Sequence, residues 1–283
     1  MSEKILGIEI GTSIIYGVVI QKTRKGIFIL DACHVPYDVK THELEEALEN
    51  LLSELDTTGC TASAITISPS MAFFRTLDFP FSSPAKIRQV LDFELASVLP
   101  LPSAGYLSDF SIIKAVIPDE TGLQYPEMAN MVAKNTKHSI FTTSVPTEIV
   151  DICFNIVSKR AVQPDMITVS GLPAAHLLTK SYSASSSEDH STITILILIN
   201  ADEITTVFIY QKNILAIRTF SITKKMPSGK PLKTDSFYNK HLQQTMTALS
   251  MRHGITGERA NYYVISSAPE KYSPEFNSKI LKP

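Results

Sequence analysis

The same order of secondary-structure elements is predicted twice along this chain of 283 residues, and the repeat limits the folds that it can adopt. Each copy has three β-strands, a helix and a fourth strand. The first copy has two apolar strands within residues 4–21, a third at 27–35, a helix capped by Thr41 and a strand at 62–68. The second copy has strands at 192–199, 205–210 and 214–221, a helix at 236–253 and a strand at 261–266. A duplicated βββαβ order predicts an α/β protein with two lobes.

The segments around the two copies indicate where the domains end. Residues 81–140 contain a helix that begins near Pro84, stops at the prolines of 99–102, and precedes short strands at 106–117 and 127–133. We interpret 81–140 as a small α+β subdomain inserted into a first lobe formed by 1–80 and 141–180. Small polar residues fill 181–191, which favours a linker. Residues 192–283 then form a second, shortened lobe.

Composition excludes several classes of function. A formal net charge of −2 does not supply the concentrated positive charge that nucleic-acid binding requires. Cys33, Cys60 and Cys153 are odd in number and far apart, so we expect buried reduced thiols, with no disulfide framework and no metal site. The first residues do not form a signal peptide, and the longest apolar run, at 193–199, is far shorter than the roughly 20 residues of a spanning helix. We therefore expect a cytoplasmic protein.

Two turns that follow predicted strands carry the chemistry that bears most on function. Glu9, Gly11, Thr12 and Ser13 are predicted to form a residual phosphate-binding turn, because glycine lets backbone N–H groups approach a phosphate closely. In the second copy we place Asn200-Ala201-Asp202 at the matching position, with Asp202 where a glycine is expected. Its carboxylate would repel a phosphate by about 4 kcal/mol at about 4 Å and an effective dielectric near 20. No catalytic residue and no metal ligand are predicted.

Residues 65–102 contain a series of motifs that resembles the family of type IV pilus assembly protein M (PilM). A strand leads to Pro69, a second strand carries Arg75, a Leu-x-x-Pro turn ends at Pro80, and a helix ends in Leu-Pro-Leu-Pro at 99–102. Similar segments follow at 145–164 and 193–221, so the resemblance covers most of residues 4–222 in order. The superfamily also includes the cytoplasmic domain of type II secretion protein L (GspL) and the division protein FtsA. The resemblance implies an actin-like (ribonuclease-H-like) bilobed fold with an inserted subdomain.

The chain departs from this family at the motifs that bind nucleotide. Glu9 stands where the family has Asp, Tyr16 where it often has Lys, and Asn200-Ala201-Asp202 where it has Asp-x-Gly. Thr168 or Ser170 replaces an acidic residue, and the second lobe lacks the Gly-Gly turns. We therefore expect no cofactor, with the binding of ATP and Mg²⁺ as the alternative. The short second lobe favours the secretion branch over PilM.

The resemblance also implies a function and partners. The chain would be a non-catalytic scaffold at the cytoplasmic face of the bacterial inner membrane, in a type II secretion or type IV pilus platform. It would link the assembly ATPase to bitopic membrane partners, and reach the membrane through them or through a segment after Pro283; a dimer is also open. Arg75 either contacts a partner or points from its strand into water. The alternatives are an ATP-binding pilus protein or small-molecule kinase of the same superfamily, and an FtsA-like filament.

Overall fold

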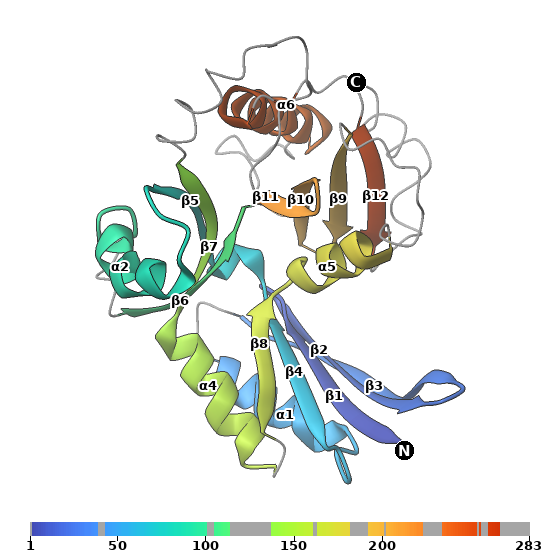
Figure 1. The fold of residues 1–283 in the computed structure, drawn as a ribbon. Helices are drawn as coiled ribbons and strands as arrows, with labels where there is room; N and C mark the ends of the chain where they lie inside the picture. Colours follow the sequence, from blue (N-terminus) through green and yellow to red (C-terminus); the bar gives the residue numbers. More distant parts are fainter. Residues whose placement is uncertain are drawn as a thin grey trace, which may run out of the picture. The chain divides into compact units, whose positions relative to one another are not determined.

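The computed structural model describes residues 2–38, 43–100, 105–113, 137–160, 163–181, 192–200, 202–222, 234–253, 255 and 260–266 (Figure 1). The chain divides into two compact units. The first comprises Met1–Phe73, Leu99–Ser108 and Ser144–Pro173, and the second comprises Phe74–Val98, Asp109–Thr143 and Ala174–Pro283.

A five-stranded sheet forms the centre of the first unit. Its strands are β1 (Glu3–Ile10), β2 (Ile14–Thr23), β3 (Gly26–Pro36), β4 (Ala62–Ile67) and β8 (Pro164–Val169), in the order β3-β2-β1-β4-β8. The first three strands are antiparallel, and β4 runs parallel to both β1 and β8. The carboxyl ends of β1, β4 and β8 therefore meet at one edge of the sheet (Figure 1).

Two helices, α1 (Leu44–Glu54) and α4 (Thr147–Ser158), contact each other and the sheet. Alternate residues of β1, including Leu6 and Ile8, are buried, as are Leu48 and Leu51 of α1. Gly17 on β2 leaves room for α1, because a Cβ atom there would lie 2.5 Å from the Leu55 side chain. The predicted cap of α1 is wrong, since Glu43 holds the N-cap position. Thr41 lies outside the described residues.

The predicted duplication is confirmed by a four-stranded sheet in the second unit. Its strands are β9 (Ile193–Ile199), β10 (Glu203–Tyr210), β11 (Asn213–Ser221) and β12 (Ala260–Ser266), in the order β11-β10-β9-β12. This order matches β3-β2-β1-β4, and β12 is parallel to β9 as β4 is to β1. Helix α6 (Thr234–His253) lies between β11 and β12 in the sequence, as α1 lies between β3 and β4. Its Tyr238 is buried, and the Tyr238 hydroxyl is 2.9 Å from that of Thr206 on β10.

A three-stranded sheet has the order β5-β7-β6, with β5 (Phe73–Phe79), β6 (Tyr106–Ile112) and β7 (His138–Pro146). The 3₁₀ helix η2 (Pro69–Met71) precedes β5, α2 (Pro84–Ala96) follows it, and α5 (Leu172–Ser181) follows β8. The sequence did not predict β7. The strand predicted at 106–117 corresponds to β6, and its residues 114–117 lie outside the described residues. The predicted strand at 127–133 and nearly all of the predicted linker at 181–191 lie outside the described residues. The boundaries proposed for the inserted subdomain and the two lobes stay predictions.

Burial of the cysteines is less complete than expected. All three are free thiols, but only Cys153 is fully buried, and burial raises its pKa to about 12. Among the described residues, no helix is long and apolar enough to cross a membrane.

Candidate functional site

The turn between β1 and β2 is a tight hairpin. At Gly11 the backbone leaves no room for a side chain. The Gly11 N–H donates to the Ile14 carbonyl oxygen at 3.0 Å, which leaves Thr12 and Ser13 as a two-residue loop. A Cβ atom on Gly11 would lie 2.7 Å from that oxygen, closer than Cβ contacts normally come. Since Gly11 is not among the glycines with positive φ, its role is to allow this close approach.

Tyr37, which the sequence analysis missed, holds this turn from the end of β3. Its N–H donates to the Ser13 carbonyl oxygen at 2.9 Å, and its hydroxyl donates to the Gly11 carbonyl oxygen at 2.5 Å. The side chain is only 8% exposed. In the sequence, Tyr37 is simply a tyrosine just after the third predicted strand. Its contacts with Gly11 and Ser13 could be found only from the fold. Two carbonyl groups of the turn are therefore held by one residue.

Hydroxyl side chains from neighbouring strand ends lie beside this turn. The Ser68 N–H, after β4, donates to the Ile10 carbonyl oxygen at 2.8 Å, and the Ser170 N–H, after β8, donates to that of Ile67 at 2.9 Å. The Ser170 hydroxyl lies 3.0 Å from Glu9 Oε1, to which it donates. The predicted residues Glu9, Gly11, Thr12 and Ser13 are therefore brought together with these serines. Ser170, one of the two positions where the resemblance led us to expect an acidic residue, supplies a hydroxyl donor to Glu9.

The turn between β9 and β10 repeats the backbone geometry of the first turn. The Asn200 N–H donates to the Glu203 carbonyl oxygen at 2.9 Å, as Gly11 does to Ile14. The Ile222 N–H donates to the Asp202 carbonyl oxygen at 2.7 Å, as Tyr37 does to Ser13. The register agrees, because Ile199 pairs with Ile204 as Ile10 pairs with Ile15. Asn200 is therefore equivalent to Gly11.

This equivalence corrects the sequence analysis. The prediction that Asp202 takes the place of the glycine is wrong, because that place belongs to Asn200, while Asp202 stands at the position of Ser13. The expected Asp-x-Gly motif falls on Leu198-Ile199-Asn200, so both its acidic residue and its glycine are absent. The second turn therefore lacks the residues equivalent to both Glu9 and Gly11.

The second turn also carries acidic side chains where the first has a hydroxyl and an apolar group. Half-buried Asp202 and buried Glu203 replace Ser13 and Ile14. An acidic side chain about 4 Å from a phosphate charge would repel it by roughly 4 kcal/mol at an effective dielectric near 20. Among the described residues, no group of three or more His, Cys, Asp or Glu side chains could hold a metal ion.

Arg75 on β5 makes its contacts within the second unit. Its Nη1 donates to the Phe74 carbonyl oxygen at 2.8 Å, and its Nη2 donates to that of Val98, just past the end of α2, at 3.3 Å. Burial, followed by the charge of Arg75, lowers the pKa of Arg218 below its usual value. These contacts are structural, so a role of Arg75 in partner binding stays a prediction.

Three solved structures resemble this fold over nearly the whole chain. The PilM-PilN type IV pilus biogenesis complex is 14% identical with a TM-score of 0.65, covering 97% of this chain and 85% of that chain. A Bacteroides thetaiotaomicron protein with an actin-like ATPase fold is 12% identical with a TM-score of 0.57, covering 99% and 89%. The chain has an actin-like fold.

The cytoplasmic domain of EpsL, an inner membrane component of the Vibrio cholerae type II secretion system, is also similar to this actin-like chain. It is 9% identical with a TM-score of 0.55, and the alignment covers 93% of this chain and 82% of that domain. No family model matches the sequence, and no curated protein matches it. The fold expected from the resemblance to PilM and GspL is confirmed.

Proposed function

We propose that this chain is a non-catalytic scaffold of a type II secretion or type IV pilus platform at the cytoplasmic face of the bacterial inner membrane. It links the assembly ATPase to bitopic membrane partners. Two similarities support the proposal: PilM is similar over 97% of this chain and was solved in complex with PilN, and EpsL belongs to an inner-membrane secretion system. Fold does not determine function, so the chemistry of the two turns also matters.

The observation that carries the non-catalytic part of the proposal is the chemistry of the second turn. Its backbone has the geometry of the first turn, yet a side chain stands at Asn200 and two acidic residues follow at Asp202 and Glu203. A phosphate needs close N–H groups and positive or neutral surroundings. The second turn therefore keeps the backbone hydrogen bonds of the first, but its side chains do not suit a phosphate.

A working ATP-binding protein of the same fold is the second candidate. The first turn favours it, because Gly11 is present and Tyr37 holds the loop in place. One intact turn does not supply a divalent metal site, since Mg²⁺ depends on carboxylate ligands and Ser170 stands beside Glu9 where a second carboxylate is expected. We therefore place this candidate second.

Co-purification tests the scaffold role directly. The chain is co-expressed with tagged pilus and secretion ATPases, and with tagged cytoplasmic peptides of bitopic partners, from its own organism. The complexes are purified in EDTA without nucleotide. We expect a stable complex with at least one of these proteins that Mg-ATP does not alter. A chain that binds none of them, or that binds the partner peptides only with Mg-ATP, contradicts the proposal.

The same assay tests the partner role of Arg75. The Arg75→Gln variant is compared with Arg88→Gln, which changes an exposed arginine of α2 paired with Asp109. If Arg75 contacts a partner, only Arg75→Gln weakens the complex while both variants stay folded by circular dichroism. If the two variants bind equally well, Arg75 has only a structural role, through its hydrogen bonds to the Phe74 and Val98 carbonyl oxygens.

A further inference from the structure

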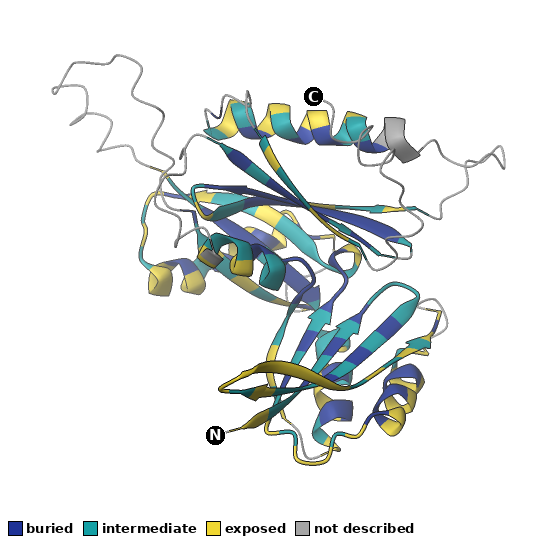
Figure 2. Cartoon of the chain, turned by 90° about the vertical axis from the view of Figure 1, so that its right-hand side faces the viewer, coloured by how far each residue is buried: buried dark blue, intermediate teal, exposed yellow. Residues whose placement is uncertain are grey.

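The end of the β2–β3 hairpin exposes an apolar surface that no described residue of the first unit covers. Four consecutive residues of β3, Ile27, Phe28, Ile29 and Leu30, are 66%, 50%, 72% and 49% exposed. Successive strand residues point to opposite faces, so apolar side chains occupy both faces of the hairpin. Figure 2 shows this hairpin coloured as exposed, in contrast to the buried positions of the same sheet. Contiguous exposed apolar surface of this kind marks an interaction site.

Positive charge is concentrated beside this apolar surface. Lys22, Arg24 and Lys25 are exposed, and no acidic residue occurs between Gln21 and Leu30. Arg24 and Lys25 form the two-residue loop, which Thr23 closes by donating from its hydroxyl to the Gly26 carbonyl oxygen at 3.1 Å. Neither loop cation makes an ion pair with a described residue; Glu3 lies opposite Lys22 on β1. The hairpin thus carries three cations in a chain whose net charge is −2.

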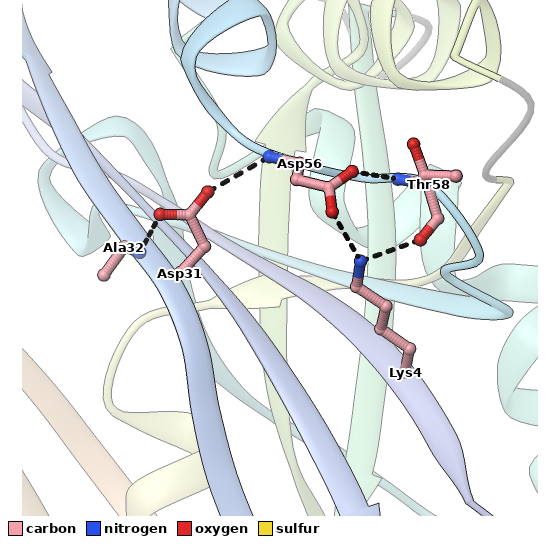
Figure 3. A network of polar contacts seen from close by, with 5 residues as sticks. All are labelled: Lys4, Asp31, Ala32, Asp56 and Thr58. Carbon is pink, nitrogen blue, oxygen red and sulfur yellow. Dashed lines mark hydrogen bonds and ion pairs between the residues drawn. The ribbon is translucent and has the colours of Figure 1, made fainter.

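The base of the hairpin is held by a network of polar contacts (Figure 3). Asp31 Oδ1 accepts from the Ala32 N–H at 2.9 Å, and Asp31 Oδ2 accepts from the Asp56 N–H at 3.1 Å. Lys4 Nζ lies 3.3 Å from Asp56 Oδ2 and donates to the Thr58 carbonyl oxygen at 2.7 Å. These contacts join β1, β3 and the segment after α1, so the hairpin projects beyond Asp31 from a fixed base.

The edge of β3 is poorly suited to pairing with a strand of another protein. Ile29 pairs with Ile20 and Asp31 with Val19, which leaves Leu30 as a bulge in the middle of the apolar segment. A bulge in an edge strand is a feature that opposes strand addition. A partner that is negatively charged, and that binds without backbone hydrogen bonds to β3, fits the hairpin better than a pairing strand does.

We propose that the β2–β3 hairpin binds directly to an anionic membrane surface. Arg24, Lys25 and Lys22 lie among the lipid headgroups, where each cation adds to the attraction, and the apolar residues reach the boundary with the acyl chains. The unpaired backbone edge of β3 keeps the hairpin out of the hydrocarbon region. This contact goes beyond the scaffold role, because the chain makes it without a protein partner.

Vesicle flotation with the full chain tests this contact. One set of vesicles contains equal parts of phosphatidylglycerol and phosphatidylcholine, and the other contains phosphatidylcholine alone. We expect binding to the anionic vesicles only, weakening as salt is added. Reversal of two charges in Arg24→Glu/Lys25→Glu should weaken binding at least about tenfold. Ile27→Ser/Ile29→Ser should weaken it by a similar factor and leave its salt dependence in place.

Matched variants elsewhere on the chain serve as controls. Lys86→Glu/Arg160→Glu makes the same change in net charge, and Phe93→Ser removes an apolar side chain that is 82% exposed on α2. Both controls should bind vesicles as the parent does, and all variants should keep the parent's circular dichroism. The proposal is overturned if the parent does not bind anionic vesicles, or if controls and hairpin variants lose binding equally. It is also overturned if the hairpin variants only abolish self-association of the chain in gel filtration.

Discussion

Gly11 and Asn200 occupy equivalent positions in two turns with the same hydrogen bonds, yet only the first turn needs a glycine. At Gly11 a Cβ atom would meet the Ile14 carbonyl oxygen at 2.7 Å. At Asn200 the backbone forms the same bond with a side chain present, at 2.9 Å. The side chain at Asn200 therefore stands where the first turn has no Cβ atom at all.

Replacing Gly11 tests this close approach. Gly11→Ala should lower the free energy of unfolding by about 1–3 kcal/mol, because the added carbon forces the turn to shift. Gly105→Ala is the control, since a Cβ atom there meets nothing within 4 Å. Urea unfolding followed by circular dichroism measures both. A midpoint for Gly11→Ala equal to that of the control contradicts the geometry of this turn.

The contact made by Tyr37 is tested by removing one hydroxyl. Tyr37→Phe should cost about 1 kcal/mol in the free energy of unfolding, since the Gly11 carbonyl oxygen loses a buried donor. Tyr106→Phe is the matched control, because Tyr106 is 7% exposed and its hydroxyl makes no hydrogen bond with a described residue. The same urea experiment compares the two variants. Equal losses would mean that Tyr37 does not hold the turn through its hydroxyl.

At the scale of elements, β5 and α6 are joined by an ion pair between residues far apart in the sequence. Arg252 Nη2 lies 2.9 Å from Asp78 Oδ1, and the Ser139 hydroxyl on β7 donates to the same oxygen. Burial opposes ionisation of Asp78, but Ser139, Arg252 and Lys137 outweigh it and lower the pKa of this carboxyl below its usual value. The pair therefore contributes stability only while Asp78 is ionised.

The pH dependence of stability follows from the sign of this shift. Because the folded pKa lies below the unfolded value of about 3.9, the contribution is complete above that value and is lost as pH falls through the folded pKa. Asp78→Asn should therefore be less stable than the parent near neutral pH, and the difference should shrink in acid. Asp109→Asn, which removes an exposed pair with Arg88, should change little. A difference for Asp78→Asn that does not depend on pH contradicts the prediction.

The elements that the sequence predicted well have simple patterns, and β7 does not. The strands of both copies show apolar runs or alternation, which predict strands whatever their partners. In β7 the hydroxyl residues Thr142 and Ser144 are fully buried, and Thr142 donates to the Arg75 carbonyl oxygen at 3.0 Å. A buried hydroxyl satisfied by a distant residue cannot be recognised from its neighbours in the sequence.

At the scale of the whole molecule, the duplicated strand order and the actin-like fold were predictable, but the register of the second turn was not. The sequence analysis placed the glycine position at residue 202, two residues after its place at Asn200. A shift of two residues keeps every side chain of a strand on the same face, so the apolar pattern is equally satisfied. Only the pairing of Ile199 with Ile204 and the bonds of the turn decide between the two alignments. Asp202 is still an acidic residue of the second turn, but it occupies the position equivalent to Ser13 and not the position of the glycine.

We propose that the second turn has lost the chemistry that nucleotide binding requires. Isothermal titration of the full chain with Mg-ATP tests it most directly, with Asn200→Gly/Asp202→Ser as the companion variant that restores the residues of positions 11 and 13 of the first turn. We predict no heat of binding for the parent at micromolar concentrations of nucleotide, and a measurable gain of affinity in the variant. Micromolar affinity of the parent for Mg-ATP would contradict the account.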